Sequence, residues 1–183
     1  MLTVALPSAF SQTRTYPDKI RGYKVERTVV EIKKTENQQA SNGDADVDTL
    51  IKLGDPKVAR VSPLGITFEV PIVVAPVKQS GRVDFLVFED MIINGRSVDI
   101  AEYKHNFDLP NKAPATLNDP LSIHIFLPSA LLAAIGEWTD SKDTWPVTGR
   151  VYVFGKFKKS IFSFKRVVPV ELKLTMRNPL REK

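Results

Sequence analysis

The sequence predicts an all-β fold, an antiparallel sandwich or barrel, and three observations carry this prediction. Short runs rich in β-branched and aromatic residues recur at spacings of about 8 to 12 residues, with turn residues between them. Asn94-Gly95 separates two such runs, and this dipeptide is typical of a two-residue hairpin turn. Residues 85–88 (Phe-Leu-Val-Phe) are all apolar, so we expect a central strand that other layers cover on both faces.

The length of 183 residues suits one domain, because a chain of this size buries about 70% of its unfolded surface on folding. We expect an N-terminal arm or signal-peptide remnant at 1–19, a single β domain at 20–176 and a C-terminal tail at 177–183. Residues 1–12 contain an apolar stub and then Ala9-Phe10-Ser11, a variant of the small-residue cleavage pattern. Export to the periplasm or the extracellular space is therefore expected, with a plain arm of a cytoplasmic protein as the alternative.

The hairpin at Asn94-Gly95 fixes a register in which Ile93 faces Arg96 and Met91 faces Val98. The same register places Asp90 opposite Asp99, and directly opposed like charges are unfavourable. A cation between the two carboxylates is one interpretation. A bulge that shifts the register, or simple solvation, is the interpretation we favour.

The first half of the chain contains four further strand patterns, at residues 23–33, 50–53, 57–61 and 66–74. Pro71 has no amide hydrogen, so it predicts a bulge or an edge position within the last of these. Asp44, Asp46 and Asp48 have the spacing of calcium ligands, but the loop lacks the glycine and glutamate of an EF-hand. We favour a solvated acidic loop.

The second half begins with a short strand at 107–110 and a clear strand at 121–127, in which Ile123 and Ile125 share one face and His124 lies on the other. Residues 128–136 predict one short helix, with Pro128 at its start and Gly136 as its C-terminal cap. Three β-rich runs follow, at 147–157, 160–164 and 167–174, and Lys158-Lys159 and Lys165-Arg166 separate them.

No pattern in the chain indicates catalysis, a metal site or a cofactor. Cysteine is absent, which removes disulfides, thiolate nucleophiles and cysteine-bound zinc. His105 and His124 are the two imidazoles, and neither belongs to a catalytic or metal-binding motif. No run approaches the 18 or so apolar residues of a membrane span. We therefore expect a protein that is not an enzyme, with a carboxylate- or metal-dependent hydrolase as the least favoured alternative.

Positive charge gathers in the C-terminal part of the chain. The net charge is +5, and residues 150–183 contain ten Lys or Arg against Glu171 and Glu182. Candidate contacts with an anion or a partner protein lie in residues 156–166: Lys156, Lys158, Lys159, Lys165 and Arg166. Phe162 and Phe164 alternate among these cations, as do aromatic residues that stack on single-stranded nucleic acid. Alternation is also typical of strand residues that face a core, and we favour this second interpretation.

Between residues 50 and 174 the order of features resembles the late embryogenesis abundant type 2 family, also called the water stress and hypersensitive response domain. The resemblance is carried by a strand that leads to a proline turn, by Ile92-Ile93-Asn94-Gly95-Arg96-Ser97-Val98, by Leu127-Pro128 before the short helix, and by Val147-Thr148-Gly149-Arg150-Val151-Tyr152 with Ile161-Phe162-Ser163-Phe164. At the proline turn the family carries Asn-Pro-Asn, whereas this chain has Ala75-Pro76-Val77. The resemblance implies an immunoglobulin- or fibronectin III-like sandwich with one small helix, no cofactor, and a role in protection against desiccation or related stress.

The leading functional hypothesis is thus a non-catalytic stress-protection protein that acts through its surface on other proteins or on the cell envelope. The alternative is a binding or assembly module that uses strand edges or the basic C-terminal third to engage a protein or an anionic surface. Nucleic acid is the less favoured partner.

Overall fold

The fold is all-β, as the sequence predicts. A computed structural model of the chain describes residues 16–26, 50–126, 143–159 and 161–180, and these ranges contain strands, turns and no helix. The helix expected at 128–136 lies outside the described residues, as do the acidic loop with Asp44, Asp46 and Asp48 and most of the strand expected at 23–33.

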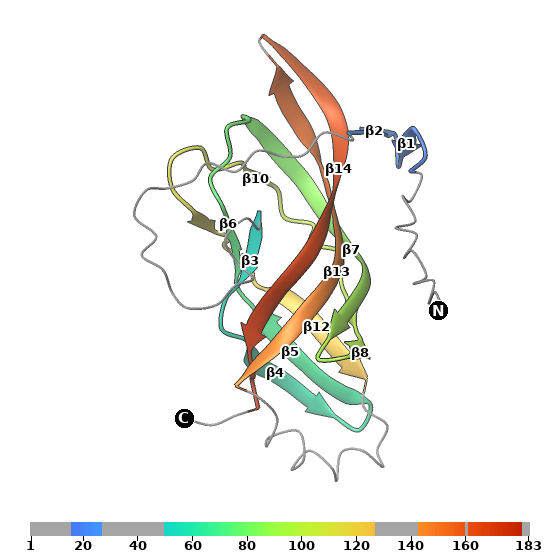
Figure 1. Cartoon of the computed structure of the whole chain (residues 1–183), viewed down its shortest axis with the longest axis vertical. Helices are drawn as coiled ribbons and strands as arrows, with labels where there is room; N and C mark the ends of the chain where they lie inside the picture. Colours follow the sequence, from blue (N-terminus) through green and yellow to red (C-terminus); the bar gives the residue numbers. More distant parts are fainter. Residues whose placement is uncertain (1–15, 27–49, 127–142, 160, 181–183) are drawn as a thin grey trace, which may run out of the picture.

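The largest sheet has seven strands in the order β1-β2-β14-β13-β7-β10, with β8 paired to β7 (Figure 1). Its strands are β1 (Lys19–Ile20), β2 (Tyr23–Val25), β7 (Gly81–Ile93), β8 (Arg96–Ser97), β10 (Phe107–Asp108), β13 (Thr144–Lys159) and β14 (Phe162–Arg177). Neighbouring strands are antiparallel except β2 and β14, which pair in parallel. β7 is an interior strand, flanked by β13 on one side and by β8 and β10 on the other, and this position agrees with its apolar residues on both faces.

Two smaller sheets complete the fold. One contains β11 (Ala115–Thr116), β6 (Ile72–Val74) and β3 (Ile51–Leu53); the other contains β4 (Lys57–Ser62), β5 (Gly65–Val70), β12 (Leu121–Phe126) and β9 (Asp99–Ile100). Pro71 lies between β5 and β6 and therefore marks the point where the chain passes from one small sheet to the other. The expected single strand at 66–74 is thus two strands, because proline lacks the amide hydrogen that a continuous ladder needs.

The turn at Asn94-Gly95 is confirmed. Both residues have positive φ, 49° and 76°, as a type I′ turn requires, and Ile93 pairs with Arg96. The next residue, Val98, donates its N–H to Met91 O at 3.0 Å, as the predicted register requires. Beyond Val98 the chain joins β12, where Asp99 pairs with His124. Asp90, with φ of 53°, lies at a bulge of β7. The predicted opposition of Asp90 and Asp99 is therefore wrong, and the bulge that we favoured as an alternative is present.

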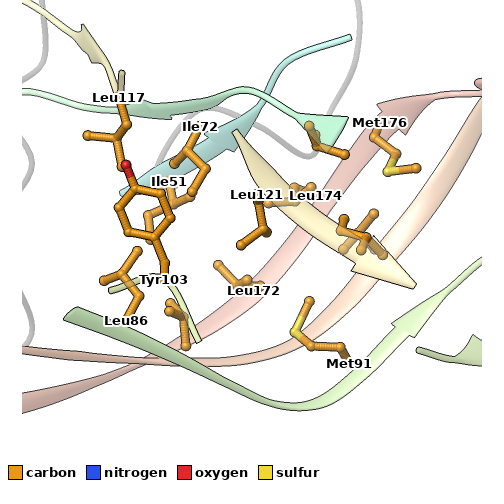
Figure 2. Close-up of a cluster of buried hydrophobic side chains, with 14 of the residues drawn as sticks. Ile51, Ile72, Leu86, Met91, Tyr103, Leu117, Leu121, Leu172, Leu174 and Met176 are labelled. Atoms are coloured by element: carbon orange, nitrogen blue, oxygen red, sulfur yellow. The ribbon is translucent and has the colours of Figure 1, made fainter. Parts of the chain in front are cut away.

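The hydrophobic core lies between the seven-stranded sheet and the two smaller sheets. Figure 2 shows Leu121 and Ile72 gathered with Leu86 and Leu172, which come from the large sheet. Phe68 and Trp145, both 0% exposed, meet edge to face in the same core with ring centroids 6.5 Å apart. Phe68 comes from a small sheet and Trp145 from the large sheet, so the two layers pack face to face in a sandwich-like arrangement.

The long β13–β14 hairpin differs from the prediction at two places. Lys165-Arg166 does not interrupt a strand, because β14 runs continuously from Phe162 to Arg177 and pairs with β13 along its whole length. Charged residues remain compatible with a strand where their side chains reach solvent. The tail is expected to begin at residue 177, but Arg177 is the last residue of β14. Asn178 is 2% exposed, and its N–H donates to Asp143 O at 2.8 Å.

Candidate anion-binding hairpin tip

The end of the β13–β14 hairpin projects beyond the rest of the large sheet (Figure 1). The neighbouring strand β7 begins at Gly81, which pairs with Phe157, and the last bond to that side joins Lys158 N to Ser80 O. Beyond this point the two strands continue as a ribbon that β7 does not flank. We call residues 156–166 the hairpin tip.

Apolar side chains are exposed on the hairpin tip. Ile161 is 88% exposed, Phe162 61% and Phe164 39%. The favoured interpretation of the two phenylalanines as core residues is therefore wrong. Phe164 pairs with Phe157, so both side chains lie on the core side of the ribbon. Phe157 is buried in the core, but Phe164 is already partly exposed. Phe162 lies two residues further out, where the opposite layer no longer covers it.

Three cations form a row on the other face of the hairpin, across three strands. Lys156 pairs with Arg82 of β7 on one side and with Lys165 of β14 on the other. Directly opposed like charges destabilise a sheet unless a counter-charge lies nearby. Asp108 of β10 faces Arg82 and ends the row. Among the described residues, no acidic side chain forms an ion pair with Lys156 or Lys165.

The remaining predicted cations differ in their surroundings. Lys158 is exposed, and like Lys156 it makes no ion pair with an acidic residue of the described ranges. The ammonium of Lys165 lies 5.7 Å from the ring centroid of Tyr23. Arg166 lies on the aromatic face, 5.2 Å from the Phe164 ring, and forms a 3.5 Å ion pair with Glu26. The side chain of Lys159 lies outside the described part of the chain.

A second polar cluster surrounds Arg150, which is 7% exposed and which the sequence reasoning missed. Its Nε and Nη2 atoms each lie 2.8 Å from Oε1 of Glu171, and Nη1 lies 3.1 Å from Oε2 of Glu89. The Tyr152 hydroxyl donates to the same Glu89 oxygen at 2.8 Å, and the Tyr16 ring lies 5.6 Å from the guanidinium carbon. Burial alone lowers the pKa of Arg150, but its hydrogen bonds to Tyr152 and Glu171 prevail and raise it. The guanidinium thus has two carboxylate partners within the protein, and we assign the cluster a structural role.

The two histidines lie in different places and do not form a joint site. His105 Nδ1 lies 3.1 Å from Asp119 Oδ2, and both side chains are about half exposed. His124 Nδ1 lies 3.1 Å from the hydroxyl of Thr67 on β5. In residues 16–26, 50–126, 143–159 and 161–180, no three His, Asp or Glu side chains come together as metal ligands.

Strands β1 and β2 extend the large sheet beyond β14, and apolar side chains of residues 16–26 cover its outer face, opposite the main core. Tyr23 contacts Phe85 and Phe154 edge to face, at centroid distances of 5.9 Å and 5.2 Å. The Tyr23 hydroxyl donates to Asp84 Oδ2 at 2.9 Å. Burial and then this hydrogen bond raise the pKa of Tyr23. This segment therefore contacts β14 next to the hairpin tip, through the pairing of Lys24 with Arg166, and also contacts β7 and β13 through Tyr23.

Comparisons with known proteins add little. No family profile matches the chain, and no curated protein matches it. Among solved structures, a protein from Archaeoglobus fulgidus is similar over 68% of this chain and 97% of its own, with 14% sequence identity and a TM-score of 0.30. That similarity is too low to transfer a fold or a function. Within the described ranges, no helix has the length and apolar character needed to cross a membrane.

Proposed function

We propose that this protein is a non-catalytic binding module that engages an anionic, phosphate-bearing partner through its hairpin tip. The single observation that carries the proposal is the composition of that tip. Ile161 and Phe162 are exposed on a projecting ribbon, and its other face holds opposed lysines that form no ion pair with an acidic residue of the described ranges. Soluble proteins rarely concentrate exposed apolar groups at one place without a partner for them.

Electrostatics supports the same proposal. Residues 156–166 contain five Lys or Arg and no Asp or Glu. The repulsion between Lys156 and Lys165 costs stability in the free protein, and a bound anion relieves it. Each basic residue close to an anionic surface contributes about 1 kcal/mol of binding free energy.

Charge reversal tests the proposal. The variant Lys158→Glu/Lys165→Glu is compared with Lys57→Glu/Lys173→Glu, which has the same net charge but changes exposed lysines of β4 and of the distant half of β14. The probes are phosphatidylcholine vesicles that contain phosphatidylserine, and a single-stranded oligonucleotide. We expect the tip variant to bind at least one probe roughly 30-fold more weakly than the control, since two lysines contribute about 1 kcal/mol each. Equal binding by both variants would disprove the proposal.

The resemblance to the late embryogenesis abundant type 2 family leads to a second proposal, in which the protein is exported and protects other molecules during drying, on an immunoglobulin- or fibronectin III-like scaffold. The features that support it are the strand patterns of residues 50–174. A labile enzyme dried with this protein should keep more activity than the same enzyme dried with an equal mass of an inert protein. Equal or lower retained activity would count against this role.

A further inference from the structure

We infer that the anionic partner is a phospholipid surface and that the hairpin tip inserts Ile161 and Phe162 into its interfacial region. The inference rests on the proposed function and names the class of partner for the same site. Three features of the tip favour lipid over nucleic acid: the placement of its rings, the depth of its apolar end and the position of its cations.

The aromatic rings and most of the cations lie on opposite faces of the ribbon. Phe162 and Phe164 share the core-side face, whereas Lys156, Lys158 and Lys165 lie on the other. A single-stranded nucleic acid needs stacking rings beside the cations that hold its phosphates, on one continuous surface. If the hairpin tip enters a membrane end-on, lipid headgroups surround the ribbon, and both of its faces contact lipid at the same time.

The dimensions of the ribbon suit interfacial insertion. Ile161, the most exposed large apolar residue in the described part of the chain, is at the turn, and Phe162 follows it directly. Lys165 lies three residues from Phe162, which corresponds to about 10 Å along a strand. Apolar groups of interfacial segments enter the boundary between headgroups and acyl chains to a depth of about 5–10 Å. The lysines therefore reach the phosphates when the apolar end reaches the acyl boundary.

The long lysine side chains can adjust the height at which their ammonium groups meet the lipid phosphates. Lysine stems lie along apolar surface while their ammonium groups reach polar surroundings. Lys158 sits one strand across from Ser163, next to the turn, so its ammonium can extend toward the headgroups around the inserted tip. Arg166, which lies over the Phe164 ring, adds a guanidinium on the opposite face.

The absence of cysteine makes a direct test of insertion available. The variant Ile161→Cys carries one thiol, which is labelled with an environment-sensitive fluorophore. The control is Leu64→Cys, a 65% exposed position in the turn between β4 and β5. With vesicles that contain phosphatidylserine, we expect the emission of the label at position 161 to shift to shorter wavelength. The label at position 64 should keep the emission that it has in buffer.

A second variant measures the contribution of the ring. Phe162→Ser should weaken vesicle binding by about 10- to 100-fold, the effect of withdrawing one large apolar side chain from an apolar phase. Its unfolding midpoint in urea should equal that of the unmodified protein, because Phe162 is outside the core. This equality separates a loss of binding from a loss of folding.

The outcomes distinguish this inference from the proposed function. Sedimentation with vesicles but no spectral shift at position 161 would overturn insertion and leave surface docking. Binding to the oligonucleotide but not to vesicles would overturn the lipid partner and leave an anion-binding tip. If the charge-reversal variant Lys158→Glu/Lys165→Glu bound both vesicles and the oligonucleotide as well as its control does, the proposed function itself would be disproved.

Discussion

Three phenylalanines on one face of the β13–β14 ribbon show that the position of a residue along a strand decides whether its side chain is buried or exposed. Phe157, Phe164 and Phe162 all point to the core side, yet Phe157 is 5% exposed and Phe162 is 61% exposed. The alternation of Phe162 and Phe164 in sequence correctly indicates that these two share a face. It carries no information on where the opposite layer ends, because that boundary depends on strands far away in the sequence. The exposure of Phe162 is therefore a result of tertiary structure.

Arg150 illustrates a residue without any local signal. Its partners Glu171 and Glu89 lie 21 and 61 residues away, so only the pairing of β13 with β14 and β7 brings them together. A sequence pattern cannot distinguish this arginine from the exposed ones around it.

Replacement of Arg150 tests the structural role of its cluster. We expect Arg150→Met to lower the free energy of unfolding by roughly 1–3 kcal/mol, because several charge-assisted hydrogen bonds are lost while Glu89 and Glu171 stay partly solvated. Arg60→Met, at an exposed position of β4, is the matched control and should change stability by less than about 0.5 kcal/mol. Urea unfolding measures both. Equal effects of the two substitutions would contradict the assignment.

Tyr23 predicts how stability depends on pH. Burial and the hydrogen bond to Asp84 raise its pKa in the folded state above the ordinary value of 10.0. The folded state therefore binds this proton more tightly, and the corresponding stability is complete below pH 10 and is lost as pH rises toward the folded pKa. Tyr23→Phe should remove this component, so the stability difference between the two proteins should shrink above pH 10. A difference that stays constant from pH 8 to pH 11 would contradict the shift.

At the scale of elements, local chemistry predicts turns well and strand lengths less well. Asn94-Gly95 specifies its hairpin because both residues tolerate positive φ, and Pro71 marks a real discontinuity. The prediction that Lys165-Arg166 separates two strands is wrong, because charged residues occur both in turns and in exposed strands. The prediction that residues 85–88 of β7 are covered on both faces is confirmed, because Leu86 lies in the main core and Phe85 packs with Tyr23 and Phe154 on the outer face of the sheet.

The turn between β4 and β5 offers a sharp test of element geometry. Gly65 has φ of 149°, and a Cβ atom there would lie 2.1 Å from the carbonyl oxygen of Ile125. Gly65→Ala should therefore cost at least about 2 kcal/mol of stability through strain and backbone displacement. Gly95→Ala also has positive φ but meets nothing within 4 Å, so it should cost only about 1 kcal/mol. Thermal or urea unfolding compares them, and the reverse order would contradict the described turn.

At the scale of the whole molecule, the sequence predicts the all-β class but not the division into one large and two small sheets. That division depends on Pro71 and on β9, which leaves the hairpin of β7 to join β12. The packing of residues 16–26 on the outer face was also beyond sequence reasoning, since β2 holds to β14 through a short parallel pairing. The basic residues of the candidate site were identified from sequence, whereas their arrangement opposite exposed rings required the structure.

The most direct test of the central claim is amide hydrogen exchange, measured with and without phosphatidylserine-containing vesicles. If the hairpin tip is the binding surface, exchange should slow in peptides that cover residues 156–166 and stay unchanged in those that cover residues 57–65 at the β4–β5 turn. Protection confined to another part of the chain, or unchanged exchange at the tip in vesicle-bound protein, would contradict the account.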